Sequence, residues 1–373
     1  SASTRTARRP DVHGISAVAG GRTAAQADNS IASFGGYSMQ EMAANITTGA
    51  SSGCPTTTAI ANAQPTANAG ADYVIPRSTP FILTGSATDA NTSNVLTYSW
   101  EQMDNAVATQ PPAATNTGGP AWVPLLPQTT PVRYMPNLPA VIANTTPTWE
   151  VLSSVARTYN FRLTVRDNVA GGGCAKQDNM VVTVNGTAGP FVVTAPNTAV
   201  SWTALTSQTV TWNVASTNTA PVNCANVDIL LSTDGGLTYP TVLATATPND
   251  GTQSITVPNV ATTTARVMVR ANGNIFYDIS NTNFTITVPA TPDYTLGVTN
   301  ASATACQPAN ATYAIQVGSI LGYNSPVTLG TSGLPSGLTA SFSANPVTPA
   351  GTTTLGAFSS THGSSSATVV PRA

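Results

Sequence analysis

Residues 67–103 read ANAGADYVIPRSTPFILTGSATDANTSNVLTYSWEQM, and this stretch decides the fold class. It holds three short runs of β-branched, aliphatic and aromatic residues, at positions 73–75, 81–84 and 96–100. Pro, Gly, Asp and Asn separate the runs, and these residues favour tight turns between strands. The stretch therefore predicts the opening strands of a β-sandwich, with Trp100 filling one face of the third strand.

The rest of the chain repeats this kind of module. Residues 159–167 (YNFRLTVRD) place apolar side chains on one face of a strand and polar ones on the other. Further strand-like runs follow at intervals of about ten residues, as in immunoglobulin-like sandwiches. We therefore expect an all-β chain of tandem immunoglobulin-like β-sandwich modules after a short, mostly irregular segment with one helix. The expected boundaries are 1–64 for an arm, the helix and a linker, 65–186 for the first sandwich with a long insertion at 104–150, 187–290 for the second sandwich, and 291–373 for a third, truncated one.

The N-terminal segment supplies the helix. Met39, Met42 and Ile46 recur at helical spacing between positions 38 and 46, which predicts a short helix there. Ser1 opens a polar, arginine-containing arm that lacks the apolar core of a signal peptide. We therefore expect the chain to be a mature or excised part of a longer protein.

The composition limits the partners. Only 8% of the 373 residues are charged and the net charge is -2, so no basic surface for nucleic acid is expected. No run reaches the roughly 18 consecutive apolar residues of a membrane helix, so no membrane span is expected. The remaining partners are a protein or polysaccharide surface, or other copies of the chain. A secreted or cell-surface location fits this set of partners.

The histidines bear on catalysis. A zinc peptidase site of the His-Glu-x-x-His type needs two histidines one helical turn apart and a glutamate. The chain has two histidines, His13 and His362, at opposite ends of the sequence, which excludes that site. Residues 232–239 (STDGGLTY) match the Asp-box pattern, which we interpret as a structural turn built by Asp and Gly. No catalytic and no cofactor-binding residue is predicted.

Two groups of Asp and Asn residues at the ends of the modules are candidate ligands for calcium. Calcium takes six to eight oxygen ligands, which carboxylates and amides of turns can supply. The alternative is that these residues only form turns. The candidate ligands are Asp89, Asn91, Asn94, Asp167, Asn168 and Asp178.

The cysteines are spaced about one per module. They allow three complete pairings, and a disulfide between any two of them would bridge modules; the alternative is four buried thiols. The disulfide candidates are Cys54, Cys174, Cys224 and Cys306.

A run of short phrases resembles a known family. The phrases are 65–72 (PTANAGAD), 83–89 (LTGSATD), 96–102 (LTYSWEQ), 160–168 (NFRLTVRDN), 189–194 (GPFVVT), 231–236 (LSTDGG) and 333–338 (GLPSGL). They resemble the PKD-like and immunoglobulin-like modules that follow the catalytic domain of secreted reprolysin-like zinc metallopeptidases exported by the type IX secretion system. The resemblance implies that residues 38–46 end a peptidase domain, and that zinc belongs to a catalytic domain missing from this chain.

Three functions follow from these patterns. The first is a set of extracellular, non-catalytic spacer or binding modules of a secreted metallopeptidase-like protein. The second is a structural or adhesive cell-surface or filament subunit that assembles by pairing of strand edges. The third is a fragment of an active zinc metalloendopeptidase whose catalytic half lies upstream.

Overall fold

The computed structural model describes residues 36–49, 51–53, 60–170, 172–289, 291–298, 302–305, 311–332, 334, 337–359 and 365–368. The predicted arm at 1–9 and the residues His13, His362, Cys54 and Cys306 lie outside these ranges. Strands dominate the described residues, and none of the helices among them is long and apolar enough to cross a membrane. The expected all-β fold class is confirmed.

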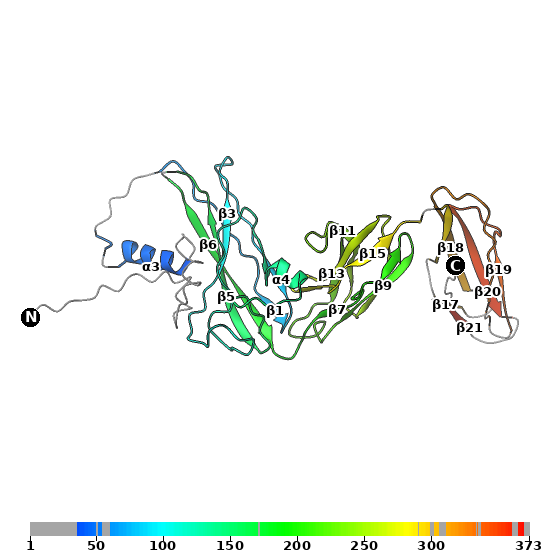
Figure 1. The fold of residues 1–373 in the computed structure, drawn as a ribbon, viewed down its shortest axis with the longest axis horizontal. Helices are drawn as coiled ribbons and strands as arrows, with labels where there is room; N and C mark the ends of the chain where they lie inside the picture. The colour runs from blue at the N-terminus through cyan, green and yellow to red at the C-terminus, as the bar shows by residue number, and fades with distance from the viewer. Residues whose placement is uncertain are drawn as a thin grey trace, which may run out of the picture. The chain divides into compact units, whose positions relative to one another are not determined.

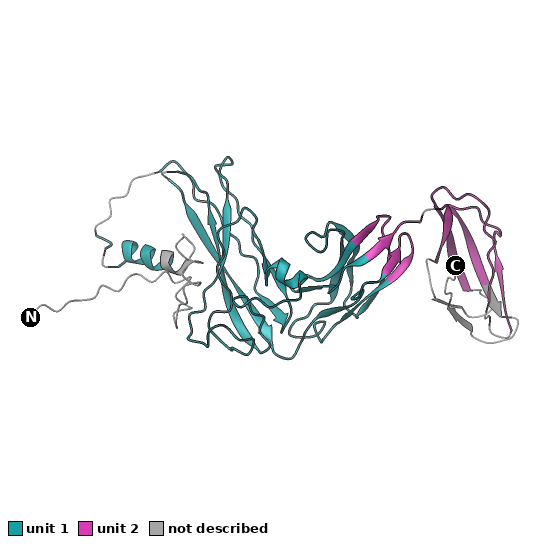
Figure 2. Cartoon of the chain, in the orientation of Figure 1, with its two compact units in different colours: residues 1–200, 209–255, 264–284 teal, residues 201–208, 256–263, 285–373 magenta. Residues whose placement is uncertain are grey.

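The chain divides into two compact units, which Figure 2 shows in different colours. The first unit comprises residues 1–200, 209–255 and 264–284, so it holds the first sandwich and most of the second. The second unit comprises residues 201–208, 256–263 and 285–373. Figure 1 gives the labels of the elements used below.

Helix α3 (Gly36–Thr47) forms where helical spacing predicts a helix, and it begins two positions before residue 38. The Arg162 guanidinium donates a hydrogen bond to the Gln40 side chain, which ties the helix to the first sandwich. Two of the three apolar residues of the predicted face, Met42 and Ile46, are 41% and 50% exposed. The described part of the chain therefore does not bury these two side chains.

The first sandwich is built from two sheets. One has the strand order β1-β6-β5-β3 and the other pairs β2 with β4. Strand β4 and the short helix α4 lie inside the predicted insertion 104–150, so the insertion contributes a strand to the fold. The bounds are β1 Tyr73–Pro76, β2 Phe81–Thr84, β3 Thr97–Gln102, β4 Val132–Met135, α4 Leu138–Ile142, β5 Arg157–Arg166 and β6 Ala175–Asn185.

The core of the first sandwich is aromatic. The alternation along β5 turns Tyr159 and Phe161 inward, and both side chains are at most 1% exposed. Their rings pack against Phe81 of β2, with centroid distances of 6.4 and 6.1 Å. Trp122 of the insertion meets Phe81 edge to face at 5.5 Å. Burial of these rings holds the two sheets together.

The second sandwich is also built from two sheets. Strand β10 pairs with β11 on one side and with β13 on the other, and β14 pairs with β13. Strand β7 pairs with β9, and β8 pairs with β15 in parallel. The bounds are β7 Val192–Ala195, β8 Ser201–Thr203, β9 Ser207–Asn213, β10 Asn226–Ser232, β11 Thr241–Pro248, β12 Thr252–Thr256, β13 Thr262–Asn272, β14 Tyr277–Ile279 and β15 Phe284–Thr287.

Strand β10 is buried on both faces. Each residue from Val227 to Ser232 is buried, although an ordinary half-exposed strand buries every second residue. Val227, Ile229 and Leu231 point to one face of β10, and each is at most 1% exposed. Leu230 points to the opposite face, where it packs in an apolar cluster with residues of the first sandwich.

The third module lies in the second unit. Its larger sheet has the order β16-β18-β20-β19, and β17 pairs with β21. Tyr313, Ile315 and Val317 alternate along β18 and carry its core. The bounds are β16 Asp293–Val298, β17 Ser302–Ala305, β18 Ala311–Ile320, β19 Leu338–Phe342, β20 Gly351–Ser359 and β21 Ser365–Thr368.

Candidate functional site

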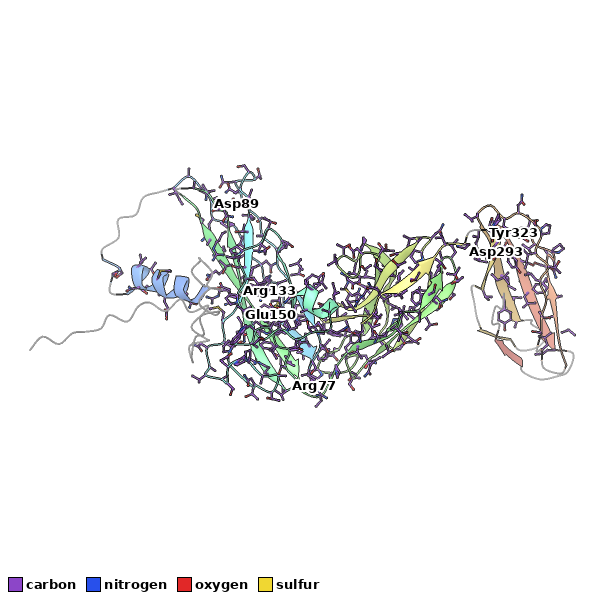
Figure 3. The ribbon with its side chains drawn as sticks, viewed as in Figure 1. Arg77, Asp89, Arg133, Glu150, Asp293 and Tyr323 are labelled. Carbon is purple, nitrogen blue, oxygen red and sulfur yellow. The ribbon has the colours of Figure 1, made fainter. Side chains whose placement is uncertain are left out.

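A polar network closes one end of the first sandwich, near Asp89 in Figure 3. The amide of Asn94 donates to the Asp89 carboxylate at 3.2 Å and to the Oδ1 atom of Asn62 at 3.0 Å. The amide of Asn62 in turn donates to the Asp167 carboxylate and to the carbonyl of Gly172. Asn62 therefore links the two acidic residues, which lie far apart in the sequence.

The other calcium candidates make separate contacts. Asn91 accepts a hydrogen bond from the backbone N–H of Ala63 at 2.8 Å, so it belongs to the same end of the sandwich. Asn168 donates to the Val95 carbonyl and to the Thr97 hydroxyl beside β3. Asp178 accepts a hydrogen bond from the N–H of Ala69 at 2.8 Å. The network through Asn62 thus gathers Asp89, Asn91, Asn94 and Asp167.

Hydrogen bonds hold Asp167 in its charged form. Burial opposes the charged form, but the N–H groups of Cys174 and Val169 and the amide of Asn62 outweigh burial. The pKa of the Asp167 carboxyl consequently lies below its ordinary value. Asp167 therefore stays an anion over the physiological range of pH.

Among the described residues, no three His, Cys, Asp or Glu side chains lie close enough to hold a metal ion together. A calcium ion at this end of the sandwich would need amide and backbone oxygens besides the carboxylates of Asp89 and Asp167. The residue that sequence reasoning missed is Asn62, which falls within the predicted linker. No pattern in the sequence marks Asn62 as a partner of Asp167.

Calcium binding at this network remains a prediction, and calorimetric titration tests it. We expect heat of binding and a rise in melting temperature with calcium, and both should disappear in Asp89→Asn and Asp167→Asn. Asp293→Asn, on the third module, is the matched control and should leave both unchanged. An unaltered melting temperature with calcium or with a chelator would exclude the site.

Two of the four cysteines, Cys174 and Cys224, lie within the described residues, and no disulfide joins them. Cys174 is partly exposed, and its N–H donates to Asp167. Cys224 is buried, and burial raises the pKa of its thiol to about 11. Cys174 and Cys224 are therefore not paired with each other. Pairing with Cys54 or Cys306 stays a prediction, because those two cysteines lie outside the described residues.

A second feature of the first unit is the joint between its two sandwiches. Strand β2 pairs with β4 on one side and with the segment that enters β14 on the other. The N–H of Ile82 donates to the Ile275 carbonyl and the N–H of Tyr277 donates to the Pro80 carbonyl, both at 2.9 Å. Phe81 and Phe276 stand opposite each other in an isolated antiparallel β-bridge, so a β-bridge connects the second sandwich to strand β2 of the first.

An apolar cluster fills the joint. Its fully buried members come from the second sandwich and include Leu230 on the outer face of β10. Tyr134 of β4 meets Tyr277 edge to face with a centroid distance of 5.7 Å. Side chains from both sandwiches exclude water from one surface, as in a single core. The cluster consists of Leu230, Met268, Tyr277 and Ile279, with Ile82, Tyr134, Val141, Ile142 and Tyr239 packed against it.

The segment that links the two sandwiches, residues 186–191 between β6 and β7, is tightly packed as well. The N–H of Arg77 donates to the Ala188 carbonyl at 3.0 Å, and the N–H of Phe191 donates to the Thr79 hydroxyl at 3.0 Å. Gly189 has a φ of +103°, and a Cβ there would lie 2.4 Å from the Arg77 carbonyl oxygen. The link therefore packs against the first sandwich and does not act as a loose tether.

The Asp-box turn has a structural part in this joint. Asp234 accepts hydrogen bonds from the N–H groups of Leu237 and Thr238, each at 3.0 Å, which closes the turn. Gly236 has a φ of +98°, and a Cβ on it would lie 3.2 Å from the side chain of Ile142 in α4. The turn thus fits against helix α4 of the first sandwich.

A buried ion pair fixes the position of α4 and of the end of β4. Arg133 and Glu150 are 3.0 Å apart, and their side chains are 7% and 4% exposed (Figure 3). Glu150 also accepts hydrogen bonds from the backbone and side chain of Asn137, the N-cap of α4. Arg133 donates to the carbonyls of Trp100 and Val123. The pair therefore connects β3 with the insertion, including β4 and α4 within it.

Asp278 of β14 lies beside the joint. Its carboxylate accepts a hydrogen bond from the N–H of Val193 at 2.7 Å, while the nearby Arg270 pairs with Asp228 instead. Burial raises the pKa of Asp278 to about 7, because the hydrogen bonds from Val193 and Ile279 compensate only part of the lost hydration.

The raised pKa of Asp278 makes the stability of the first unit depend on pH. The unfolded carboxyl loses its proton near pH 4, whereas the folded one keeps it until about pH 7. The unfolded state thus binds fewer protons in this window, so stability falls as pH rises from about 4 to about 7. We expect Asp278→Asn to remove this slope and to stabilise the protein by about 4 kcal/mol at pH 8.

Urea unfolding at several pH values measures this effect. Asp72→Asn is the matched control, since Asp72 is an exposed aspartate that also accepts a backbone N–H bond, from Val181. The control should keep the wild-type slope. An Asp278→Asn variant with the same slope as the wild type would contradict the assignment.

Comparison with known proteins gives only distant likenesses. No family model matches the sequence, and no curated protein matches it. Among solved structures, the tandem Ig repeats of Dlar are 10% identical with a TM-score of 0.32, covering 60% of this chain and 98% of theirs. Fibronectin(III)-like modules of Clostridium thermocellum CbhA are 12% identical with a TM-score of 0.20, covering 60% and 94%.

A further solved structure is SGBP-B of a Bacteroides ovatus mixed-linkage glucan utilization locus, in complex with a mixed-linkage heptasaccharide. It is 14% identical with a TM-score of 0.16, covering 79% of this chain and 61% of its own. Likenesses this remote carry no conclusion about function. The sandwich assignment rests on the strand pairings described above.

Proposed function

We propose that this chain is a non-catalytic, extracellular spacer and binding region in which the first two sandwiches act as one rigid body. The observation that supports the proposal is the joint: a shared strand pairing, a shared apolar cluster and a packed link connect the two modules. Tandem modules joined only by a tether reorient freely, whereas a large apolar interface fixes their relative orientation. A spacer with a fixed angle can hold whatever precedes and follows it at a defined separation.

We further propose that the parent protein is a secreted metallopeptidase of the reprolysin-like type with type IX export. This part rests on the sequence phrases between residues 65 and 338. The coding sequence upstream tests it, because a His-Glu-x-x-His segment there would support a peptidase parent. A complete upstream domain without that segment would contradict it.

The absence of catalysis in the chain itself has a direct test. Purified chain is incubated with an unfolded protein substrate in the presence of zinc, with and without a chelator. We expect no cleavage above background, since His13 and His362 are too few and too far apart in sequence for the zinc site. Zinc-dependent cleavage that a chelator abolishes would overturn the proposal.

A further inference from the structure

Strand β19 is an edge strand without the usual protection against pairing. It stands last in the sheet order β16-β18-β20-β19, and among the described strands it pairs with β20 alone. Figure 1 shows β19 beside β20 at the outer edge of this module. Its sequence, LTASF, contains no charge and no proline, and its register with β20 has no bulge. Natural edge strands are normally blocked by at least one of these devices.

Three other edges of the described sheets carry such devices. Strand β11 shifts register twice against β10 and ends at Pro248. Strand β16 begins with the charged Asp293. In β3, the backbone of Tyr98 exchanges hydrogen bonds of 2.7 and 2.8 Å with Gln128, so the insertion covers that edge. Within the larger sheet of the third module, β19 therefore lacks the charge that β16 carries at the opposite edge.

The register shows which backbone groups of β19 point outward. Just after β19, the N–H of Ser343 donates to the carbonyl of Thr354, the residue opposite to it. In an antiparallel ladder, residues that exchange bonds with the partner strand alternate with residues whose N–H and C=O point away. The odd positions 339, 341 and 343 therefore face β20. Leu338, Ala340 and Phe342 direct their backbone groups to the open edge.

We propose that β19 pairs with β19 of a second copy of this chain, antiparallel about a two-fold axis at Ala340. This register places Ala340 opposite itself and Leu338 opposite Phe342, and it forms roughly six N–H···O bonds. Ala340 and Phe342 pack against the core of the module, so the pairing extends one continuous core face. On the solvent face, Thr339 stands opposite Ser341, a hydroxyl pair that favours sheets.

Charge favours a second copy as the partner. Residues 291–373 contain one acidic residue, Asp293, and one basic residue, Arg372. Two such modules repel each other very little when their edges meet. The strand is also its own complement, since an apolar residue meets an apolar one and a hydroxyl meets a hydroxyl. One short strand gives a small interface, so the association is expected to be weak.

A charge-swap experiment on the full chain tests the register. Thr339→Lys with Ser341→Lys places lysine opposite lysine at both symmetry-related pairs. Thr339→Lys with Ser341→Asp places lysine opposite aspartate instead. Residues 339 and 341 are exposed and lie on the solvent face, so both double variants are expected to fold, which circular dichroism checks. Sedimentation equilibrium between about 1 μM and about 1 mM then gives each dissociation constant.

We expect concentration-dependent dimers of the wild-type chain. The lysine–lysine variant should weaken them at least about tenfold, and the lysine–aspartate variant should retain them with added salt sensitivity. A wild-type chain that stays monomeric at about 1 mM would overturn the proposal, and so would equal dimerisation of both double variants. The joint between the first two sandwiches does not enter this test, so its result leaves the spacer function untouched.

Discussion

Replacing Phe276 by alanine is expected to lower the free energy of unfolding of the first unit by about 4 kcal/mol. The Phe276 side chain is fully buried and meets the ring of Phe191 edge to face with a centroid distance of 5.1 Å. Its backbone stands opposite Phe81 in the strand pairing that connects the two sandwiches. Truncation therefore removes a large buried ring and leaves a cavity next to the joint.

Urea unfolding followed by tryptophan fluorescence measures the loss. We expect the wild type to unfold both sandwiches of the first unit together, and Phe276→Ala to separate their transitions. Phe161→Ala is the matched control, because it truncates a ring of equal size that belongs to the core of the first sandwich and not to the apolar cluster of the joint. It should cost a similar free energy but keep one common transition. Two separate transitions in the wild type would contradict the shared joint.

Removing the carboxylate of Glu150 is the second change with a large expected effect. Glu150→Ala should destabilise the protein by about 3–5 kcal/mol, because it leaves the Arg133 guanidinium buried without its counter-charge. Burial already lowers the pKa of Arg133, and the attraction of Glu150 opposes that shift. The N-cap residue Asn137 also loses its acceptor, which loosens the start of α4.

A double replacement separates the charge effect from loss of packing. Arg133→Met with Glu150→Leu removes both charges and retains most of the volume, so it should recover most of the stability lost in Glu150→Ala. Thermal and urea unfolding of the three proteins measure this coupling. If the double variant were as unstable as Glu150→Ala, an unpaired buried charge would not be the cause.

The sequence predicts much of the fold because alternation is a local property. The strand at 159–167 appears as part of β5, and the helix at 38–46 appears as α3. The run VDILL at 227–231 is also recognisable as a strand and appears in β10. Its burial on both faces was not predicted, because it depends on a distant element that covers the second face.

The joint and the polar network could not be predicted, because both depend on contacts between distant segments. Phe81 and Phe276 are nearly two hundred positions apart in the sequence, and no local pattern relates them. The stretch 104–150 was predicted as an insertion, but its strand β4 was not predicted. Strand β4 spans only four residues, which is too short for a clear pattern of alternation. Asn62 donates to Asp167 and accepts from Asn94, which also donates to Asp89, and one asparagine in a linker carries no signal.

The distance between the first two sandwiches tests the central claim most directly. Spin labels on unnatural amino acids at Thr158 of β5 and Thr245 of β11, both exposed, leave the native cysteines unchanged. Pulsed electron–electron double resonance on the full chain then gives the distribution of distances between the two spin labels. A rigid joint predicts one narrow distribution in the wild type that broadens in Phe276→Ala and stays narrow in Phe161→Ala. A broad distribution in the wild type would contradict the account of the first two sandwiches as one rigid spacer.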